Sequence, residues 1–157
     1  MPEPILSSEQ RRLLTGARRA ILATTDAAGG ARLVPICYVV SDAEATGAVV
    51  LHTPIDEKPK RTADPMLLAR VRDIAARPAV AVLVDRWSED WTELAWLRVH
   101  GDAVVLAADD PAAADERTAA IAALRTKYRQ YADQDLAGRP LIRIVVASAV
   151  SWAAGEG

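Results

Sequence analysis

The stretch RRAILATTDAAGGARLVPICYVVSDAEATGAVVLHT, residues 18 to 53, contains three apolar segments separated by two short turns. The segments 18–26, 31–40 and 48–53 consist mainly of aliphatic and β-branched residues, whereas the stretches between them contain Asp, Gly and Ser. Short strands separated by turn residues predict antiparallel hairpins, so the three segments form a meander. Pro35 removes a backbone donor from the middle strand, which we therefore expect at a sheet edge or beside a ligand or bulge.

Three more strands are expected further along the chain, at residues 79–85, 95–106 and 139–152. Helices are predicted over residues 8–15, 65–77 and 111–131, with Ser7 or Ser8, Asp64, and Asp109 or Asp110 as their caps. A meander of strands with two or three helices favours an antiparallel barrel over a parallel sheet. The prediction is a mainly β protein with helices (α+β), built on six antiparallel strands.

Composition indicates one globular domain over residues 1–157. The chain is 51% hydrophobic and 25% charged, and no sequence repeat or low-complexity linker divides it. Cys37 is the only cysteine, which excludes an intrachain disulfide. The sequence starts without the apolar run of a signal peptide, and its late apolar run is too short to span a bilayer. We therefore expect a cytoplasmic protein that does not associate with membranes.

The charge distribution points to a small anionic ligand. The chain has 19 basic and 21 acidic residues, yet residues 58–78 contain six bases and two acids. The six bases are Lys58, Lys60, Arg61, Arg70, Arg72 and Arg77. A nucleic-acid-binding domain would more often be basic throughout, so the local excess indicates a binding site for a small anion. The alternative is a solvated loop followed by the polar face of an amphipathic helix.

No known catalytic motif is present. The sequence lacks a Walker A motif and the G-x-S-x-G, H-E-x-x-H and G-x-G-x-x-G patterns. His52 and His100, the only histidines, are too far apart in sequence to indicate a metal site, and nothing near Cys37 suggests an activated nucleophile. This pattern is typical of an enzyme whose cofactor performs the reaction while the protein binds and orients it.

The order of four segments resembles a known family. RLVPICYVV (32–40), LHTPIDEK (51–58), RVRDIAARP (70–78) and VAVLVD (80–85) together resemble the split β-barrel proteins of the pyridoxamine 5′-phosphate oxidase class. The segment DRWSEDWTELAWLRVHGDAVVL (85–106) resembles more narrowly the actinobacterial branch that uses the deazaflavin coenzyme F420. The resemblance covers roughly residues 10 to 150 and implies an FMN-binding type of split barrel.

The resemblance implies a homodimer that holds flavin-like cofactors at the subunit interface. Arg32, Val34, Pro35 and Ile36 match the strand beside the ring system, while His52 and Thr53 match positions near the polyol and phosphate. Arg70 matches the phosphate ligand, Arg72 is the next basic position, and Lys58, Lys60 and Arg61 would meet further anionic groups. The polyglutamate tail of coenzyme F420 supplies such groups, whereas FMN ends at its phosphate. No residue is assigned a catalytic role.

The function implied is F420-dependent hydride transfer to or from a small organic substrate. The alternatives are an FMN-binding flavoprotein of the same fold and a non-catalytic dimer that binds flavin or haem. The carboxy-terminal substrate motif of true pyridoxamine 5′-phosphate oxidases is missing, which argues against vitamin B6 oxidation. Tyr38 could donate a proton if its hydroxyl faces the cleft. Trp87, Trp91 and Trp96 fit either a subunit interface or a lid over the ring.

Overall fold

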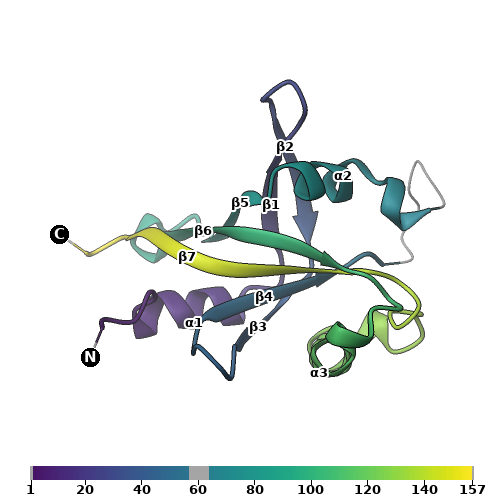
Figure 1. Cartoon of the computed structure of the whole chain (residues 1–157). Helices are drawn as coiled ribbons and strands as arrows, with labels where there is room; N and C mark the ends of the chain where they lie inside the picture. Colours follow the sequence, from purple (N-terminus) through teal and green to yellow (C-terminus); the bar gives the residue numbers. More distant parts are fainter. Residues whose placement is uncertain (1, 57–63, 157) are drawn as a thin grey trace.

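The computed structural model describes residues 2–56 and 64–156 of the chain (Figure 1). In chain order the elements are α1 (Ser8–Gly16), β1 (Ala20–Thr25), β2 (Ala31–Ile36), β3 (Val39–Asp42), β4 (Val49–Pro54), η1 (Pro65–Leu67), α2 (Ala69–Ala76), β5 (Ala79–Arg86), η2 (Trp91–Glu93), β6 (Ala95–Leu106), η3 (Pro111–Ala113), α3 (Ala114–Lys127), η4 (Arg129–Tyr131) and β7 (Leu141–Ala153). No helix among the described residues is both long and apolar enough to cross a membrane.

The strands form one antiparallel sheet with the order β2-β1-β5-β6-β7-β4-β3. The described residues form seven strands instead of the predicted six, because the segment expected as one strand over 31–40 breaks at Cys37 and Tyr38. Its two halves, β2 and β3, lie at opposite edges of the sheet, which curls without closing into the predicted barrel. Pro35 therefore lies in an edge strand, as predicted, where its missing donor costs no ladder hydrogen bond.

The two faces of the sheet have different neighbours. Along β6, Leu97 and Val99 are buried on the inner face, and Arg98 and His100 are exposed on the outer face. The inner face packs against α1 and α2 and forms the larger core. Helix α3 instead covers one end of the outer face, at the end of the sheet remote from the two termini (Figure 1). Among the described residues, the other two α-helices, α1 and α2, pack on the inner face.

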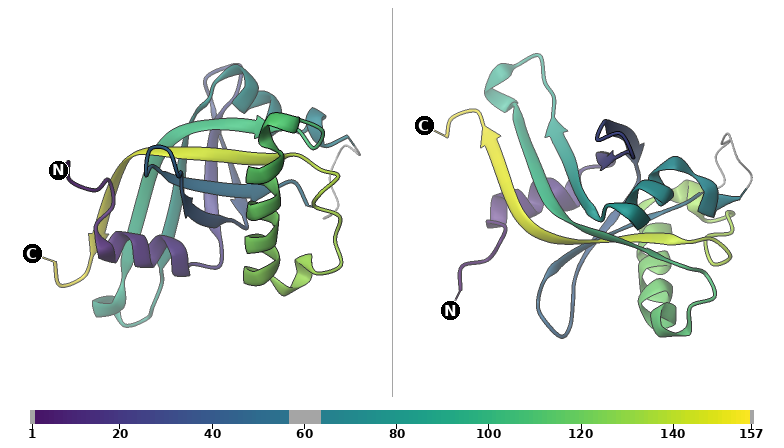
Figure 2. Two further views of the ribbon diagram at one scale, coloured as in Figure 1. Left: turned by 60° about the horizontal axis from the view of Figure 1, so that its bottom comes forward. Right: turned by 45° about the horizontal axis from the view of Figure 1, so that its top comes forward.

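The two longest strands, β6 and β7, share a bulge at the middle of the sheet. The pairing shifts between His100 and Gly101, and β7 has one additional residue, Ala147, at that point. Bulges of this kind bend a strand and increase its twist. The strong curvature of β7, drawn in yellow, is visible in Figure 2.

Helix starts agree with the predicted caps, but two of the helices begin later than predicted. Ser7 and Gln10 form a reciprocal capping box at the start of α1. Asp64 and Asp110 each accept a hydrogen bond two residues ahead, but the turns they cap are the 3-10 turns η1 and η3. The α-helical part begins only at Ala69 in α2 and at Ala114 in α3, because each proline opens a tighter turn first.

Candidate functional site

The first component of the candidate site is strand β2. It pairs only with β1, so its other edge has no partner strand within the described part of the chain. Pro35 is exposed and Val34 half-buried, whereas Ile36 is buried in the core. Of the residues predicted to lie beside the cofactor ring, Val34 and Pro35 therefore remain accessible. The unpaired backbone of an edge strand is a ready hydrogen-bonding surface for a ligand.

Arg32 on β2 is held by a buried carboxylate. Its Nε lies 2.7 Å from Oδ2 of Asp73 on α2, and the hydroxyl of Thr24 on β1 donates to the same oxygen at 3.0 Å. The hydrogen bond to Asp73, and then its charge, raise the pKa of Arg32. The Arg32 side chain is nevertheless 42% exposed, so the guanidinium is both anchored and open to solvent.

Arg70, the predicted phosphate ligand, points inward. Burial lowers the pKa of its guanidinium, while the charges of Asp56 and Tyr131 act in the opposite direction. Asp56 in turn accepts a hydrogen bond of 2.9 Å from the hydroxyl of Tyr131. Arg72, two residues further along α2, is exposed. Helix α2 therefore presents Arg72 to solvent, whereas Arg70 is half-buried within range of the negative charge of Asp56.

His52 belongs to a charged cluster beneath α3. The ring is 4% exposed, and its Nε2 lies 2.7 Å from Oε1 of Glu116. Arg143, which is opposite His52 in the sheet, donates to the other carboxylate oxygen at 3.0 Å. Burial raises the pKa of Glu116, but the contacts with His52 and Arg143 outweigh it and lower the pKa overall. Thr53, the other residue predicted near the polyol, is buried.

Glu116 and Arg143 were not identified from the sequence. Neither lies in a motif, and Glu116 is 64 residues from His52. The only sequence signal was the alternation of side chains along β7. This alternation places Arg143 on the same face as His52, but only once the pairing of β4 with β7 is known. The cluster ties α3 to the sheet.

Lys58, Lys60 and Arg61 lie outside the described residues. Their predicted contact with further anionic groups stays a prediction. Within residues 2–56 and 64–156, no group of three or more His, Cys, Asp or Glu side chains is arranged to hold a metal ion.

Tyr38 does not face a cleft. It is completely buried at the break between β2 and β3, and its hydroxyl donates to the backbone carbonyl of Leu14. Burial raises the pKa of this hydroxyl. The suggestion that Tyr38 donates a proton to the substrate is therefore wrong.

Lys127 packs its ammonium group against the same tyrosine. Its Nζ lies 4.2 Å from the centre of the Tyr38 ring and 5.4 Å from that of Tyr128, and it lacks a hydrogen-bond partner among the described residues. Burial, and then the charge of Arg18, lower its pKa to about 8 from its ordinary 10.5. The two aromatic rings supply a cation–π attraction that partly offsets the cost of burying the charge.

We expect the stability contributed by Lys127 to rise with pH between about 8 and about 10.5. In this window the unfolded chain holds a proton that the folded chain has lost, so each rise in pH favours folding. Lys127→Met removes this titration. Urea unfolding of both proteins at several pH values should show the wild type gaining about 1 kcal/mol on the variant between pH 7.5 and 9.5. A constant difference across that range would contradict the lowered pKa.

The four tryptophans lie at one end of the sheet. Trp87 and Trp91, on the β5–β6 connection, are 68% and 72% exposed. Trp96 and Trp152 are directly opposite one another in β6 and β7. Figure 2 shows the β5–β6 hairpin projecting beyond the sheet near the carboxy terminus. Such exposed tryptophans are typical of a surface that is covered in an assembly.

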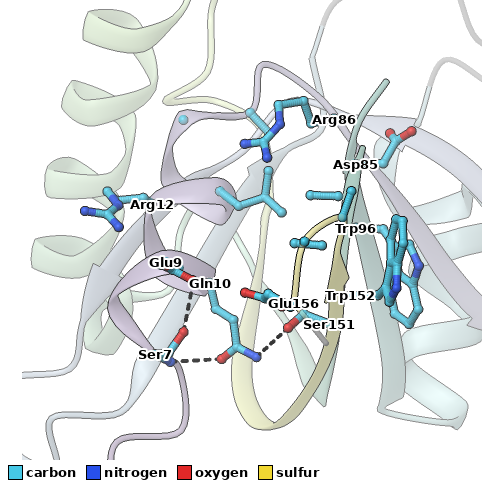
Figure 3. Close-up of a pocket in the computed structure, with 17 residues that line it drawn as sticks. Ser7, Glu9, Gln10, Arg12, Asp85, Arg86, Trp96, Ser151, Trp152 and Glu156 are labelled. Atoms are coloured by element: carbon cyan, nitrogen blue, oxygen red, sulfur yellow. Dashed lines mark hydrogen bonds between the residues drawn. The ribbon is translucent and has the colours of Figure 1, made fainter. Parts of the chain in front are cut away.

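A cavity of about 800 Å³ lies between α1 and the ends of β5, β6 and β7 (Figure 3). Gln10 crosses its lower side and donates to Ser151 at 2.8 Å, while Arg86 points into it from above. A second depression, of about 400 Å³, adjoins β2 and is lined mainly by alanines, with His100 and Asp102. Neither hollow includes a residue predicted to bind the cofactor.

Solved structures with the same fold include proteins of different kinds. A FAD-binding protein from Mesorhizobium loti is 23% identical, with a TM-score of 0.66 over 93% of this chain and 94% of that one. An F420 reductase is 20% identical, with a TM-score of 0.59 over 96% and 98%. The haem storage protein HutZ from Vibrio cholerae is 13% identical, with a TM-score of 0.61 over 98% of both chains. At these identities the likeness establishes the fold alone.

No curated protein matches this chain. The family model described as pyridoxamine 5′-phosphate oxidase, in contrast, matches residues 6–153. This match covers the accessible edge of β2, the anchored Arg32, helix α2 and all seven strands. The protein therefore belongs to the pyridoxamine 5′-phosphate oxidase family.

Proposed function

We propose that the protein is a cytoplasmic oxidoreductase that uses coenzyme F420 to transfer a hydride to or from a small organic substrate. The observation that carries the proposal is the anchored, solvent-open guanidinium of Arg32 on the free edge of β2. It places a fixed positive charge next to unpaired backbone groups, which suits a ligand with a polar ring and an anionic tail. The likeness in fold to an F420 reductase supports the same assignment.

In this proposal, β2 and α2 hold the coenzyme. The backbone of β2, with Val34 and Pro35, would lie against the ring, and Arg32 would bind the phosphate. Arg72 is exposed and would add a second cation at α2. Arg70 is half-buried and would contribute through its positive potential without direct contact with the ligand. Lys58, Lys60 and Arg61 would meet the remaining carboxylates.

When bound and reduced, the deazaflavin supplies the hydride, and the protein supplies binding and orientation. Holding two reactants in place converts an encounter between molecules into a step within one complex, which accounts for much of the rate gain in such enzymes. With Tyr38 buried, solvent is the proposed source of any proton that the product requires.

We further propose that the protein is a homodimer. The outer face of the sheet between β2 and β7 carries no helix, and large apolar side chains are exposed across it. They are Leu33, Leu83, Val104, Val145, Val150 and Trp152. In the sheet, Leu83 on β5 and Val150 on β7 flank Arg98 on β6, so the three lie in one cross-strand row. Exposed apolar surface of this extent indicates contact with another protein, and a second copy is the partner we propose.

Leu83→Glu is expected to convert the dimer to a monomer, because it would bury two carboxylates in the interface together with the Arg98 opposite each of them, and desolvating these charges is costly even where they pair. Light scattering coupled to size-exclusion chromatography measures the mass directly. Ile5→Glu is the matched control, since Ile5 is similarly exposed but lies in the amino-terminal segment before α1. A wild-type protein of monomeric mass at micromolar concentration would contradict the proposed dimer.

Two alternatives share this fold. The FAD-binding relative favours a flavin-dependent protein, and the haem storage relative favours a non-catalytic binding protein. For haem, His52 is a poor candidate ligand because its Nε2 is already engaged by Glu116. The other histidine, His100, is exposed on the outer face, and its Nε2 accepts a hydrogen bond of 3.2 Å from Nε of Arg98.

Separate titrations of the protein with coenzyme F420, FMN and haem test the proposal. Tryptophan fluorescence and the absorbance of each ligand give the affinities, and reduced F420 is then offered to a panel of small unsaturated or carbonyl compounds. The proposal predicts tightest binding of F420, weakening with salt, and oxidation of the reduced coenzyme. Tighter binding of FMN would favour the alternative of a flavin-dependent protein. Binding of haem without turnover would favour the alternative of a non-catalytic binding protein.

A further inference from the structure

We propose that Asp73 is a positioning residue that, together with Thr24, aims Arg32 at the anionic part of the bound cofactor. The inference rests on the proposed function, since it concerns the same site. It assigns a role to two residues that do not touch the ligand themselves, and thereby explains why a carboxylate is buried at the rim of a site that binds an anion.

The geometry of the three residues supports this role. Thr24 and Arg32 are directly opposite one another in the β1–β2 pair, and Asp73 reaches both of them from α2. Both donate to the same oxygen of Asp73, at 3.0 and 2.7 Å. Asp73 is only 7% exposed, so this carboxylate is enclosed by protein. Its hydroxyl partner fixes the carboxylate, and the carboxylate then fixes the arginine.

The consequence for Arg32 is a preset orientation. Arginine has a planar guanidinium with five donors, and its contact with Asp73 occupies Nε. The side chain is 42% exposed, which leaves the outer part of the guanidinium turned to solvent. A free arginine loses several rotamers when it binds an anion, whereas Arg32 has already lost them in the folded protein. Asp73 therefore removes an entropic cost from ligand binding.

Asp73 also has an effect that opposes ligand binding, and varying the salt concentration distinguishes it from the positioning effect. The negative charge of Asp73 lies on the other side of the Arg32 guanidinium from the ligand anion and repels that anion. The repulsion is screened at high ionic strength, because the Debye length falls from about 30 Å at 0.01 M to below 10 Å at physiological salt. The benefit of a preset side chain does not depend on salt. The benefit therefore dominates at high salt and is partly cancelled at low salt.

The experiment is a titration of Asp73→Asn with coenzyme F420 and with FMN. Asparagine keeps the size of the side chain and removes the charge. We expect the variant to bind about 3- to 10-fold more weakly than the wild type at 0.3 M salt, with a smaller difference at 0.01 M. Equal or tighter binding by the variant at 0.3 M salt would overturn the inference.

A double-mutant cycle separates positioning from a purely structural effect. If Asp73 acts through Arg32, then at 0.3 M salt, where its direct repulsion of the ligand is screened, Asp73→Asn does not weaken binding further once Arg32→Met is present. A loss of the same size in both backgrounds would overturn the inference. Thermal melts identify any variant that does not fold, and Thr24→Val, which removes only the hydroxyl, then repeats the test with a milder change. If the wild type binds neither cofactor, the proposed function fails, and this inference with it.

Discussion

Replacing Gly101 by alanine is expected to lower the free energy of unfolding by about 3 kcal/mol. A Cβ at this position would lie 2.1 Å from the backbone oxygen of Val145 and 2.9 Å from its carbonyl carbon. These are backbone atoms of the neighbouring strand, so no rotamer change relieves the overlap. Gly101 is located at the β6–β7 bulge, and the two strands would have to separate in the middle of their paired length.

Urea unfolding followed by circular dichroism measures this loss. Gly16→Ala is the matched control, because no atom lies within 4 Å of a Cβ added at the end of α1. Since alanine favours helix over glycine, this control is expected to be neutral or stabilising by up to about 1 kcal/mol. If Gly101→Ala unfolded at the same urea concentration as the wild type, the close approach of β6 and β7 would be incorrect.

Arg32→Met is expected to weaken the binding of F420 or FMN by about 10- to 100-fold. Hydrogen bonds to charged groups are worth about 1.5–3 kcal/mol, and methionine keeps the apolar stem while removing every donor. Titration by tryptophan fluorescence gives the affinity. Arg32→Lys retains the charge but loses the planar guanidinium, so an intermediate affinity is expected.

Two further arginine variants serve as comparisons. Arg12→Met removes one positive charge from exposed surface on α1 and should leave cofactor affinity unchanged. Arg70→Met should reduce affinity less than Arg32→Met and reduce stability more, because it takes a countercharge from Asp56. A larger loss of affinity with Arg70→Met than with Arg32→Met would return the phosphate role to Arg70, as the sequence alone suggested.

Local pattern predicted the individual elements well. The alternation of apolar and polar residues predicted β6 over 95–106, which the structure confirms, and the serine before α1 forms the predicted cap. Pro35 correctly indicated an edge strand. Each of these features depends on residues within a few positions of one another, so the sequence contains the information directly.

For the candidate site, the sequence predicted which types of residue take part but not how their side chains are arranged. The basic excess at α2 was visible, but Arg70 is half-buried, and the accessible Arg32 is anchored by a residue 41 positions away. The Nε2 of His52 is likewise engaged by Glu116, which lies on α3, two strands further along the chain. The direction of a long charged side chain is set by the nearest opposite charge, and that neighbour is a product of the fold.

By itself, the sequence determined the class of the protein, the positions of most strands and helices, and its membership of the family through the order of weak motifs. Only the tertiary structure decided that one apolar segment supplies both edges of the sheet, and which arginine is free to meet a ligand. The physical reason is range. Backbone periodicity and capping act over a few residues, whereas strand order and charge pairing are settled between residues that meet only after the chain has folded.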